Sequence, residues 1–157
     1  MIVVSNTTPL NYLVILKKVD ILPALFGSVV IPPAVVTELG RSESPEPVRA
    51  WIVAPPAWLR VETPQQMDVS LDLDLGESQA IMLAEQLHSD RILLDDFKAR
   101  QLATARGLKV AGTLAVLVEA HQRGLLNLRQ TIDELRRTTF YVDQDLLDTV
   151  LARLGKP

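Results

Sequence analysis

Short apolar runs that alternate with segments of helical periodicity are the feature of this sequence that most constrains its fold. Each run is rich in Val, Ile or Leu, and most are followed by a stretch of about ten residues with apolar positions at helical spacing. Parallel strands need crossover connections, so the alternation predicts an α/β fold whose parallel sheet is covered by helices on both faces. The expected strands lie at residues 2–4, 29–31, 59–62, 92–94 and 108–111.

Capping residues and prolines set the expected helix boundaries. In the first helix, Thr8 is expected to be the cap, with Pro9 at the first helical position. Between residues 41 and 64, repeated prolines leave room for only a turn or two of helix near residues 48–52. The other expected helices cover residues 20–26, 34–39, 76–87, 97–106, 114–123, 128–137 and 145–154.

Length and composition exclude several classes of protein. A chain of 157 residues is expected to form a single domain, 1–157, that needs no disulfide or metal in order to fold. There is no cysteine, and the two histidines, His88 and His121, are too far apart for a local zinc motif. A net charge of −3 argues against binding nucleic acid by bulk positive charge. Without an apolar run of ~18 residues or a basic leader, we expect a cytoplasmic protein that does not enter the membrane.

Polar residues at or near the ends of the expected strands are the candidates for a functional site. In a parallel sheet, sites form outside the carboxyl ends of the strands. Carboxylates gathered there repel one another, and a cation is the usual compensation. Oxygen-only ligands favour Mg²⁺ or Mn²⁺, which can activate water and stabilise the oxygens of a phosphodiester. The candidates are Asn6, Glu38, Glu77, Asp95 and Asp96.

Each candidate also has an ordinary structural explanation. Asp95 and Asp96 could cap the helix that starts near Phe97. Glu77 would be favoured in the first turn of a helix by the helix dipole, and Glu38 could be a solvated surface charge. Asn6 could brace the turn before Pro9 through hydrogen bonds to the backbone.

Four segments in a fixed order carry a resemblance to a known family. They are IVVSNTTPL (residues 2–10), IPPAVVTEL (31–39), LGESQA (75–80) and LLDDFKAR (93–100). Together they resemble a PIN domain, most closely the bacterial and archaeal PIN-like proteins related to VapC toxins. The resemblance covers nearly the whole chain, and it depends on the order and spacing of all four segments.

The resemblance implies a metal-dependent ribonuclease with a central sheet of about five strands between two layers of helices. Glu38 and Glu77 match acidic positions of the family, and either Asp95 or Asp96 matches the last one. Asn6 stands where the family usually has its first aspartate. An amide oxygen can still bind a cation but brings no charge, which puts metal affinity and activity in question.

Binding partners follow from the same resemblance and from the composition. RNA is the expected substrate, and Lys98 and Arg100, just beyond the aspartate pair, are the candidates for contacts with its phosphates. A mean hydropathy of +0.19 suggests more apolar surface than a monomer needs. A homodimer would fit this, as would a small antitoxin that buries the acidic pocket. The expected function is therefore the toxin of a toxin–antitoxin pair.

Two other functions remain open at the level of sequence. A PIN-like fold weakened by Asn6 could serve as a binding module for RNA or protein. A serine hydrolase is the second alternative, because residues 76–80 resemble a G-x-S-x-G elbow with Ser78 as nucleophile and His121 following Asp95 in the required order. Such an elbow needs a strand directly before it.

Overall fold

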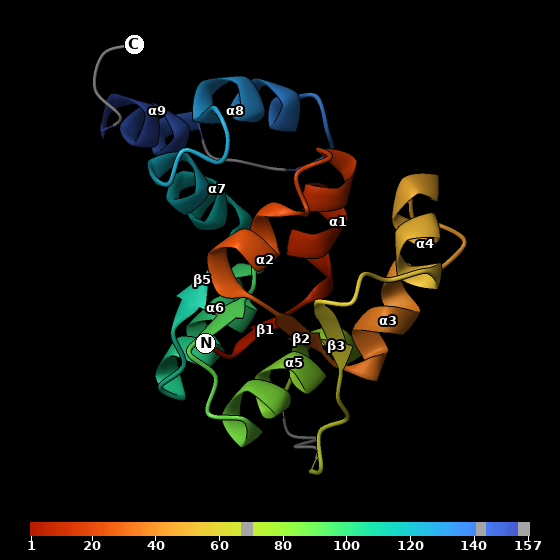
Figure 1. Ribbon diagram of the computed structural model, residues 1–157. Coiled ribbons are helices and arrows are strands. Elements are labelled where there is room, and N and C mark those ends of the chain that lie inside the picture. Colours follow the sequence, from red (N-terminus) through yellow and green to blue (C-terminus); the bar gives the residue numbers. More distant parts are fainter. Residues whose placement is uncertain (67–70, 141–143, 154–157) are drawn as a thin grey trace.

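The computed structural model describes residues 1–66, 71–140 and 144–153 and is built around one parallel sheet. The sheet has the strand order β3-β2-β1-β4-β5, and every neighbouring pair is parallel. The expected α/β fold with a parallel five-stranded sheet is therefore confirmed (Figure 1). The strands are β1 (Val3–Ser5), β2 (Val29–Ile31), β3 (Leu59–Val61), β4 (Arg91–Leu93) and β5 (Val110–Ala111).

Helices connect the strands and continue after the last one. Most boundaries lie within a residue or two of those expected. The main exception is α4, which is longer than a turn or two because Pro45 and Pro47 stand at its start, where a missing N–H costs nothing. The described helices are α1 (Thr7–Ile15), α2 (Ile21–Phe26), α3 (Pro33–Leu39), α4 (Glu46–Val53), α5 (Leu75–Gln86), α6 (Phe97–Ala105), α7 (Thr113–Gln122), α8 (Leu128–Arg136) and α9 (Gln144–Arg153). Residue 154, the expected end of the last helix, lies outside the described residues.

The start of α1 differs from the expectation that Thr8 caps it. The cap is Asn6, and the helix begins at Thr7, so Pro9 occupies the third helical position. A proline fits there because the first N–H groups of a helix have no partner within the helix. Asn6 is therefore both the first residue after β1 and the capping residue of α1.

Two apolar clusters cover the two faces of the sheet. Successive residues of a strand point to opposite faces. Val3 of β1 therefore joins the cluster that includes α1, α2 and α7, whereas Val4 joins the one formed with α5 and α6. Figure 1 shows α5 on one side of the sheet and α1, α2 and α7 on the other. Both faces are buried, which explains why the strands are continuously apolar rather than alternating.

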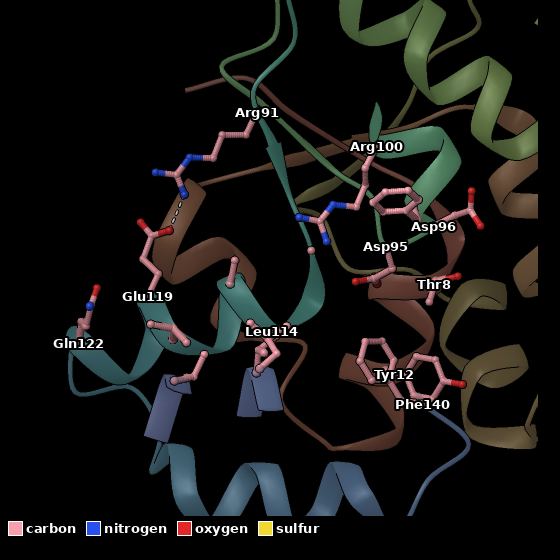
Figure 2. Close-up of a pocket in the computed structure, with 16 residues that line it drawn as sticks. Thr8, Tyr12, Arg91, Asp95, Asp96, Arg100, Leu114, Glu119, Gln122 and Phe140 are labelled. Carbon is pink, nitrogen blue, oxygen red and sulfur yellow. Dashed lines mark hydrogen bonds and ion pairs between the residues drawn. The ribbon is translucent and has the colours of Figure 1, made fainter. Parts of the chain in front are cut away.

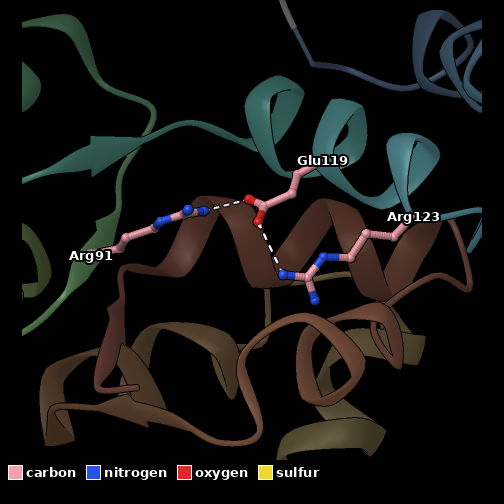
Figure 3. A network of polar contacts seen from close by, with 3 residues as sticks. All are labelled: Arg91, Glu119 and Arg123. Atoms are coloured by element: carbon pink, nitrogen blue, oxygen red, sulfur yellow. Dashed lines mark hydrogen bonds and ion pairs between the residues drawn. The ribbon is translucent and has the colours of Figure 1, made fainter.

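Paired charges lie at the edge of the sheet where the strands begin. The guanidinium of Arg91, at the start of β4, forms an ion pair with Glu119 of α7, and Arg123 lies 3.8 Å from the same carboxylate (Figure 3). At the same edge, Arg106 at the end of α6 is 2.8 Å from the carboxylate of Glu85 in α5. We call this edge, where the strands begin, the amino edge of the sheet. The charges there serve to join helices to one another and to the sheet.

Among the residues that the structure describes, no helix combines the length and the apolar character needed to cross a membrane.

Candidate active site

The candidate site lies at β1 and β4, where the order in which strands are added to the sheet changes direction. From β1 the chain crosses to β2 on one side, whereas β4 pairs with the other side of β1. The helices that follow β1 and β4 consequently pack on opposite faces, α1 on one and α6 on the other. A crevice outside the carboxyl ends of two such strands is the usual place for a site in an α/β sheet. Asn6 follows β1 and the Asp95–Asp96 pair follows β4, so the sequence candidates stand at this crevice.

Asn6 is held by its backbone while its side-chain oxygen remains unpaired. Its N–H donates to the carbonyl of Leu93 at 3.0 Å, and its side chain is only 4% exposed. An asparagine at a helix cap ordinarily accepts a backbone hydrogen bond, but Asn6 makes no such bond. Its Oδ1 is buried without any hydrogen-bond partner among the described residues. The turn-bracing explanation for Asn6 thus finds no contact to support it.

Glu38, in the last turn of α3, reaches across to the starts of two other helices. Its Oε2 accepts a hydrogen bond from the hydroxyl of Thr7, the first residue of α1. Its carboxylate also lies against Gly76 in α5, where a Cβ would stand 2.5 Å from Oε1. Only glycine leaves room for the carboxylate in this position, so Gly76 and Thr7 together place Glu38 beside the crevice.

Glu77 is a buried carboxylate surrounded by others. It lies in the first turn of α5, is 8% exposed, and its N–H donates to the capping carboxylate of Asp74 at 2.8 Å. Burial, and then the negative charges of Asp74, Asp96 and Glu38, raise the pKa of Glu77 to about 7. Among the described residues, Glu77 has no ion pair with a lysine or arginine. Three other acids therefore act on Glu77, with no ion pair within the described residues to offset them.

The two consecutive aspartates do different things. Asp96 caps α6, accepting the N–H of Ala99 at 3.0 Å, and its charge is one of those that raise the pKa of Glu77. Asp95 instead reaches the start of α7, where its two oxygens accept the N–H of Thr113 at 2.7 Å and the hydroxyl of Thr113 at 2.6 Å. The capping expected for the pair is confirmed for Asp96. Asp95 joins the end of β4 to the start of α7.

Arg100 lies next to Asp95, and Gly112 makes the contact sterically feasible. Burial raises the pKa of Asp95, whereas the bonds from Thr113 and the charge of Arg100 act in the opposite direction. A Cβ at Gly112 would lie 2.9 Å from Asp95 Oδ1 and 3.2 Å from a guanidinium nitrogen of Arg100. Figure 2 shows Arg100 extending towards Asp95, while the Asp96 carboxylate points away from it. Asp95 therefore has a basic neighbour that the acids around Glu77 lack.

Two grooves include acidic residues of the candidate site in their linings. The aromatic groove, about 1050 Å³ in volume, includes Asp95 and Asp96 on its rim and is walled by α1, α6 and α7 (Figure 2). The smaller groove, about 640 Å³, contains Glu38 and Asp74 together with Arg41. Each groove also has arginine in its lining: Arg91 and Arg100 in the first and Arg41 in the second.

The donor atoms fit a hydrated divalent cation better than a fully protein-coordinated one. Within residues 1–66, 71–140 and 144–153, no three Asp, Glu or His side chains converge closely enough to form a ready metal-binding group. Mg²⁺, however, keeps several waters and is commonly bound through one or two carboxylates. The unpaired Oδ1 of Asn6 and the carboxylate oxygens of Glu77 and its acidic neighbours are donors of the kind that such an ion requires.

The basic candidates differ in their surroundings. Lys98 points to solvent and pairs with the fully exposed Asp72, with 2.7 Å between the charged atoms. That pair contributes little to stability because both groups stay hydrated. Arg100, two residues further along α6 and next to Asp95, lines the aromatic groove. Arg100 is thus better placed than Lys98 to contact a bound ligand.

Several residues that shape the site were not among the sequence candidates. Asp74 has a recognisable signal, because an aspartate three residues before a glutamate is a typical helix-start pattern. Thr7, Gly76, Gly112 and Thr113 carry no comparable signal. Their roles depend on contacts between segments distant in the sequence, such as Thr113 with Asp95.

The serine hydrolase alternative is contradicted by the surroundings of Ser78. Residues 71–74, directly before α5, form no strand, so the strand–turn–helix elbow is missing. Ser78 is buried within the helix. His121 lies in the last turn of α7, where its Nδ1 accepts the N–H of Leu128 at 3.2 Å.

Comparisons with known proteins agree with this architecture. Residues 2–156 match a family model described as a PIN domain. Among solved structures, the fold is similar to that of a PilT N-terminus domain protein from the hyperthermophilic archaeon Sulfolobus solfataricus P2. The TM-score is 0.51 and the identity 14%, over 91% of this chain and 100% of the other. No curated protein sequence is significantly similar to this chain. The match over almost the full length shows that the chain belongs to the PIN-domain family, whose members are generally nucleases.

Proposed function

We propose that this protein is an endoribonuclease that depends on Mg²⁺ or Mn²⁺ and hydrolyses phosphodiester bonds at the edge of the sheet where the strands end. We call this edge the carboxyl edge. The observation that carries the proposal is the group formed by Glu38, Glu77 and Asp96. The charges of Asp96 and Glu38 act on the buried Glu77, and none of the three acids has an ion pair among the described residues. The side-chain oxygen of Asn6, which caps the helix whose Thr7 binds Glu38, is buried and unpaired. Uncompensated acids at such a place are costly, so a functional reason is expected for them.

The residues of the group would share the work of holding a cation. Glu77 and Asp96 are the proposed carboxylate ligands, and the Oδ1 of Asn6 is a neutral third donor. Glu38, fixed by Thr7, would orient a water or complete the shell. A divalent ion in this place supplies Lewis-acid activation of water and neutralises the acids. Asp95 is a positioning residue in this scheme, because both of its oxygens already accept hydrogen bonds from Thr113.

A cleavage assay on labelled single-stranded RNA tests the proposal. Cleavage should require added Mg²⁺ or Mn²⁺, stop when EDTA is added, and return when the metal is restored. Calorimetric titration of the protein with Mn²⁺ alone supplies a second readout that does not depend on turnover. Heat of binding that disappears in Glu77→Gln would support the assignment. Cleavage that survives complete chelation would overturn it.

We also propose the biological setting that the sequence resemblance implies, the toxin of a toxin–antitoxin pair. The supporting argument is the similarity of the four segments to VapC-related proteins, together with the positive mean hydropathy. Induced expression should arrest growth of a bacterial host, and co-expression of a small protein encoded next to this gene should restore growth. Growth that continues at high expression of an active nuclease would contradict the toxin role.

A second candidate function is supported by the same site. Asn6 in place of an acid and the absence of a three-ligand group among the described residues favour a PIN-like fold that binds RNA without cleaving it. In that case RNA should bind with unchanged affinity in EDTA, and no cleavage should appear at saturating Mn²⁺.

A further inference from the structure

The largest exposed aromatic surface of the described residues stands directly beside the acidic site. Phe97 is 74% exposed, and every other aromatic side chain in the described part of the chain is at least partly buried. It follows Asp96 in the sequence, is the first residue of α6, and lines the aromatic groove. Because the ring is exposed and lines the groove, it is open to a ligand that enters there.

Arg100 lies on the same face of α6 as Phe97. Residues three apart in a helix are neighbours on its surface, and both of these side chains line the aromatic groove. An aromatic face with an adjacent guanidinium is the pattern by which proteins bind single-stranded nucleic acid, with a base stacked on the ring and a cation near the backbone. The glycine at position 112 keeps open the space that the guanidinium occupies.

The opposite wall of the groove supplies apolar and aromatic surface. Tyr12 of α1 packs edge-on against Phe140, with 4.8 Å between ring centroids, and the Tyr12 hydroxyl is held by the Thr139 hydroxyl at 2.7 Å. Leu114 and Val118 of α7 continue this wall. Figure 2 shows Tyr12, Phe140 and Leu114 together on the side opposite Arg100. The groove volume of about 1050 Å³ is at the upper end of that of small-molecule sites, so it has room for a nucleotide.

We propose that the aromatic groove is a subsite for an unpaired nucleobase of single-stranded RNA, stacked on Phe97, with Arg100 near the adjoining phosphate. This inference rests on the proposed nuclease function, because it places the base next to the phosphodiester that the acids would act on. A base inside a duplex cannot offer its face to Phe97. The subsite therefore selects single-stranded over double-stranded RNA.

Binding measurements in EDTA test the subsite separately from cleavage. Fluorescence anisotropy with a labelled single-stranded oligoribonucleotide should show weaker binding for Phe97→Ala by about five- to hundredfold. Phe97→Trp should bind at least as tightly as the wild type. The matched control is Val53→Ala, which removes an 82% exposed apolar side chain on α4, outside both grooves, and should leave affinity unchanged.

An oligonucleotide with abasic positions identifies stacking as the cause. If Phe97 contacts a base, the wild type and Phe97→Ala should bind an abasic strand equally, since the partner of the ring is gone. Arg100→Gln should lower the affinity for both the intact and the abasic oligonucleotide and make binding less dependent on salt.

The outcomes separate the subsite from the nuclease proposal. Equal affinities of Phe97→Ala and Val53→Ala for single-stranded RNA would overturn the subsite even if metal-dependent cleavage is found. Unchanged RNA affinity together with a change of oligomeric state in Phe97→Ala, measured by light scattering, would assign the ring to a protein interface instead. Weaker RNA binding by Phe97→Ala in a protein that never cleaves RNA would support the subsite and reject the nuclease.

Discussion

Two glutamates of α5, which lie near opposite edges of the sheet, have opposite electrostatic surroundings. At the amino edge, the carboxylates of Glu85 and Glu119 each face an arginine. At the carboxyl edge, Glu77 faces only other carboxylates, although it belongs to the same helix as Glu85. Both glutamates are at least partly buried, so burial alone does not distinguish them.

This difference between Glu85 and Glu77 indicates which charged side chains stabilise the fold. A partly buried acid with an arginine partner joins two elements, as Glu85 joins α5 to the end of α6. A buried acid among like charges destabilises the folded protein when it is ionised, and such an arrangement is typical of a functional site. The comparison predicts that the same kind of substitution will have opposite consequences at the two edges.

The largest expected effect separates Glu77 from Glu85. Glu77→Gln should reduce metal-dependent RNA cleavage by about 100-fold or more, because a charged donor near the cation is lost. Its midpoint of unfolding in urea should not fall. Glu85→Gln should keep its cleavage rate and lose about 1 kcal/mol of stability or less, as expected for a partly exposed ion pair. If both variants lose activity equally, the two edges do not differ in function.

Asp95 should behave as a structural residue although it adjoins Asp96. Asp95→Asn turns an NH₂ group towards one of the two donors of Thr113, which should cost about 1–3 kcal/mol in urea unfolding. Asp133→Asn is the matched control, because that carboxylate is exposed and lies 3.9 Å from Arg136. We expect it to change stability by less than about 0.5 kcal/mol. An Asp95→Asn variant that is fully stable but inactive would instead make Asp95 a ligand.

Stability without metal should fall as the pH rises through the range in which Glu77 ionises. The pKa of Glu77 is raised from 4.5 to about 7 by folding, so the folded state holds more protons than the unfolded state between these values. The free energy of unfolding therefore decreases with pH, by on the order of 1–2 kcal/mol, over that window. Glu77→Gln should flatten the profile. Denaturation curves in EDTA at several pH values measure both proteins.

Gly76→Ala should affect activity more than stability. The new Cβ would stand 2.5 Å from the Glu38 carboxylate, and the flexible end of Glu38 has to move away from Thr7. We expect cleavage to fall by about tenfold, while the helix itself gains from replacing glycine. At Gly40 the nearest atom to an added Cβ is 3.5 Å away, so Gly40→Ala should leave cleavage unchanged.

The smallest expected effect comes from restoring a charge at Asn6. Asn6→Asp should tighten Mn²⁺ binding by several-fold, up to about tenfold, because an oxygen is already in place and only its charge changes. Cleavage at limiting metal should rise with it. Equal affinities in calorimetric titrations of the two proteins would remove Asn6 from the metal site and leave the carboxylates as the remaining candidates.

The carboxyl edge could be predicted from sequence because parallel strands bring their ends together. That rule alone places Asn6 and the aspartate pair near one another. The same rule cannot divide the roles of Asp95 and Asp96, which follow the same strand. Their difference arises from Thr113, 18 residues beyond Asp95, which takes both oxygens of that side chain.

The grooves and the roles of the glycines beside them cannot be predicted from the sequence, because they depend on contacts between distant segments. The aromatic groove combines α1, α6, α7 and residues after α8, so no single segment carries its pattern. The close approach of Gly76 to Glu38 involves a contact between α3 and α5. The boundary of α1 was missed because Thr8–Pro9 is a good helix start locally, while the bond from Asn6 to Leu93 fixes the helix start earlier.

The alternation of Val3 and Val4 between the two apolar clusters has a consequence for how this chain can change in length. β1 has three residues, each paired with a residue of β4, and their alternation fixes which side chain enters which apolar cluster. Deleting or inserting one residue there would exchange the faces of both valines and turn Asn6 away from the crevice. Gains and losses of residues should therefore be excluded from β1 but accepted between α4 and Trp58, at residues 54–57, which lie outside both grooves.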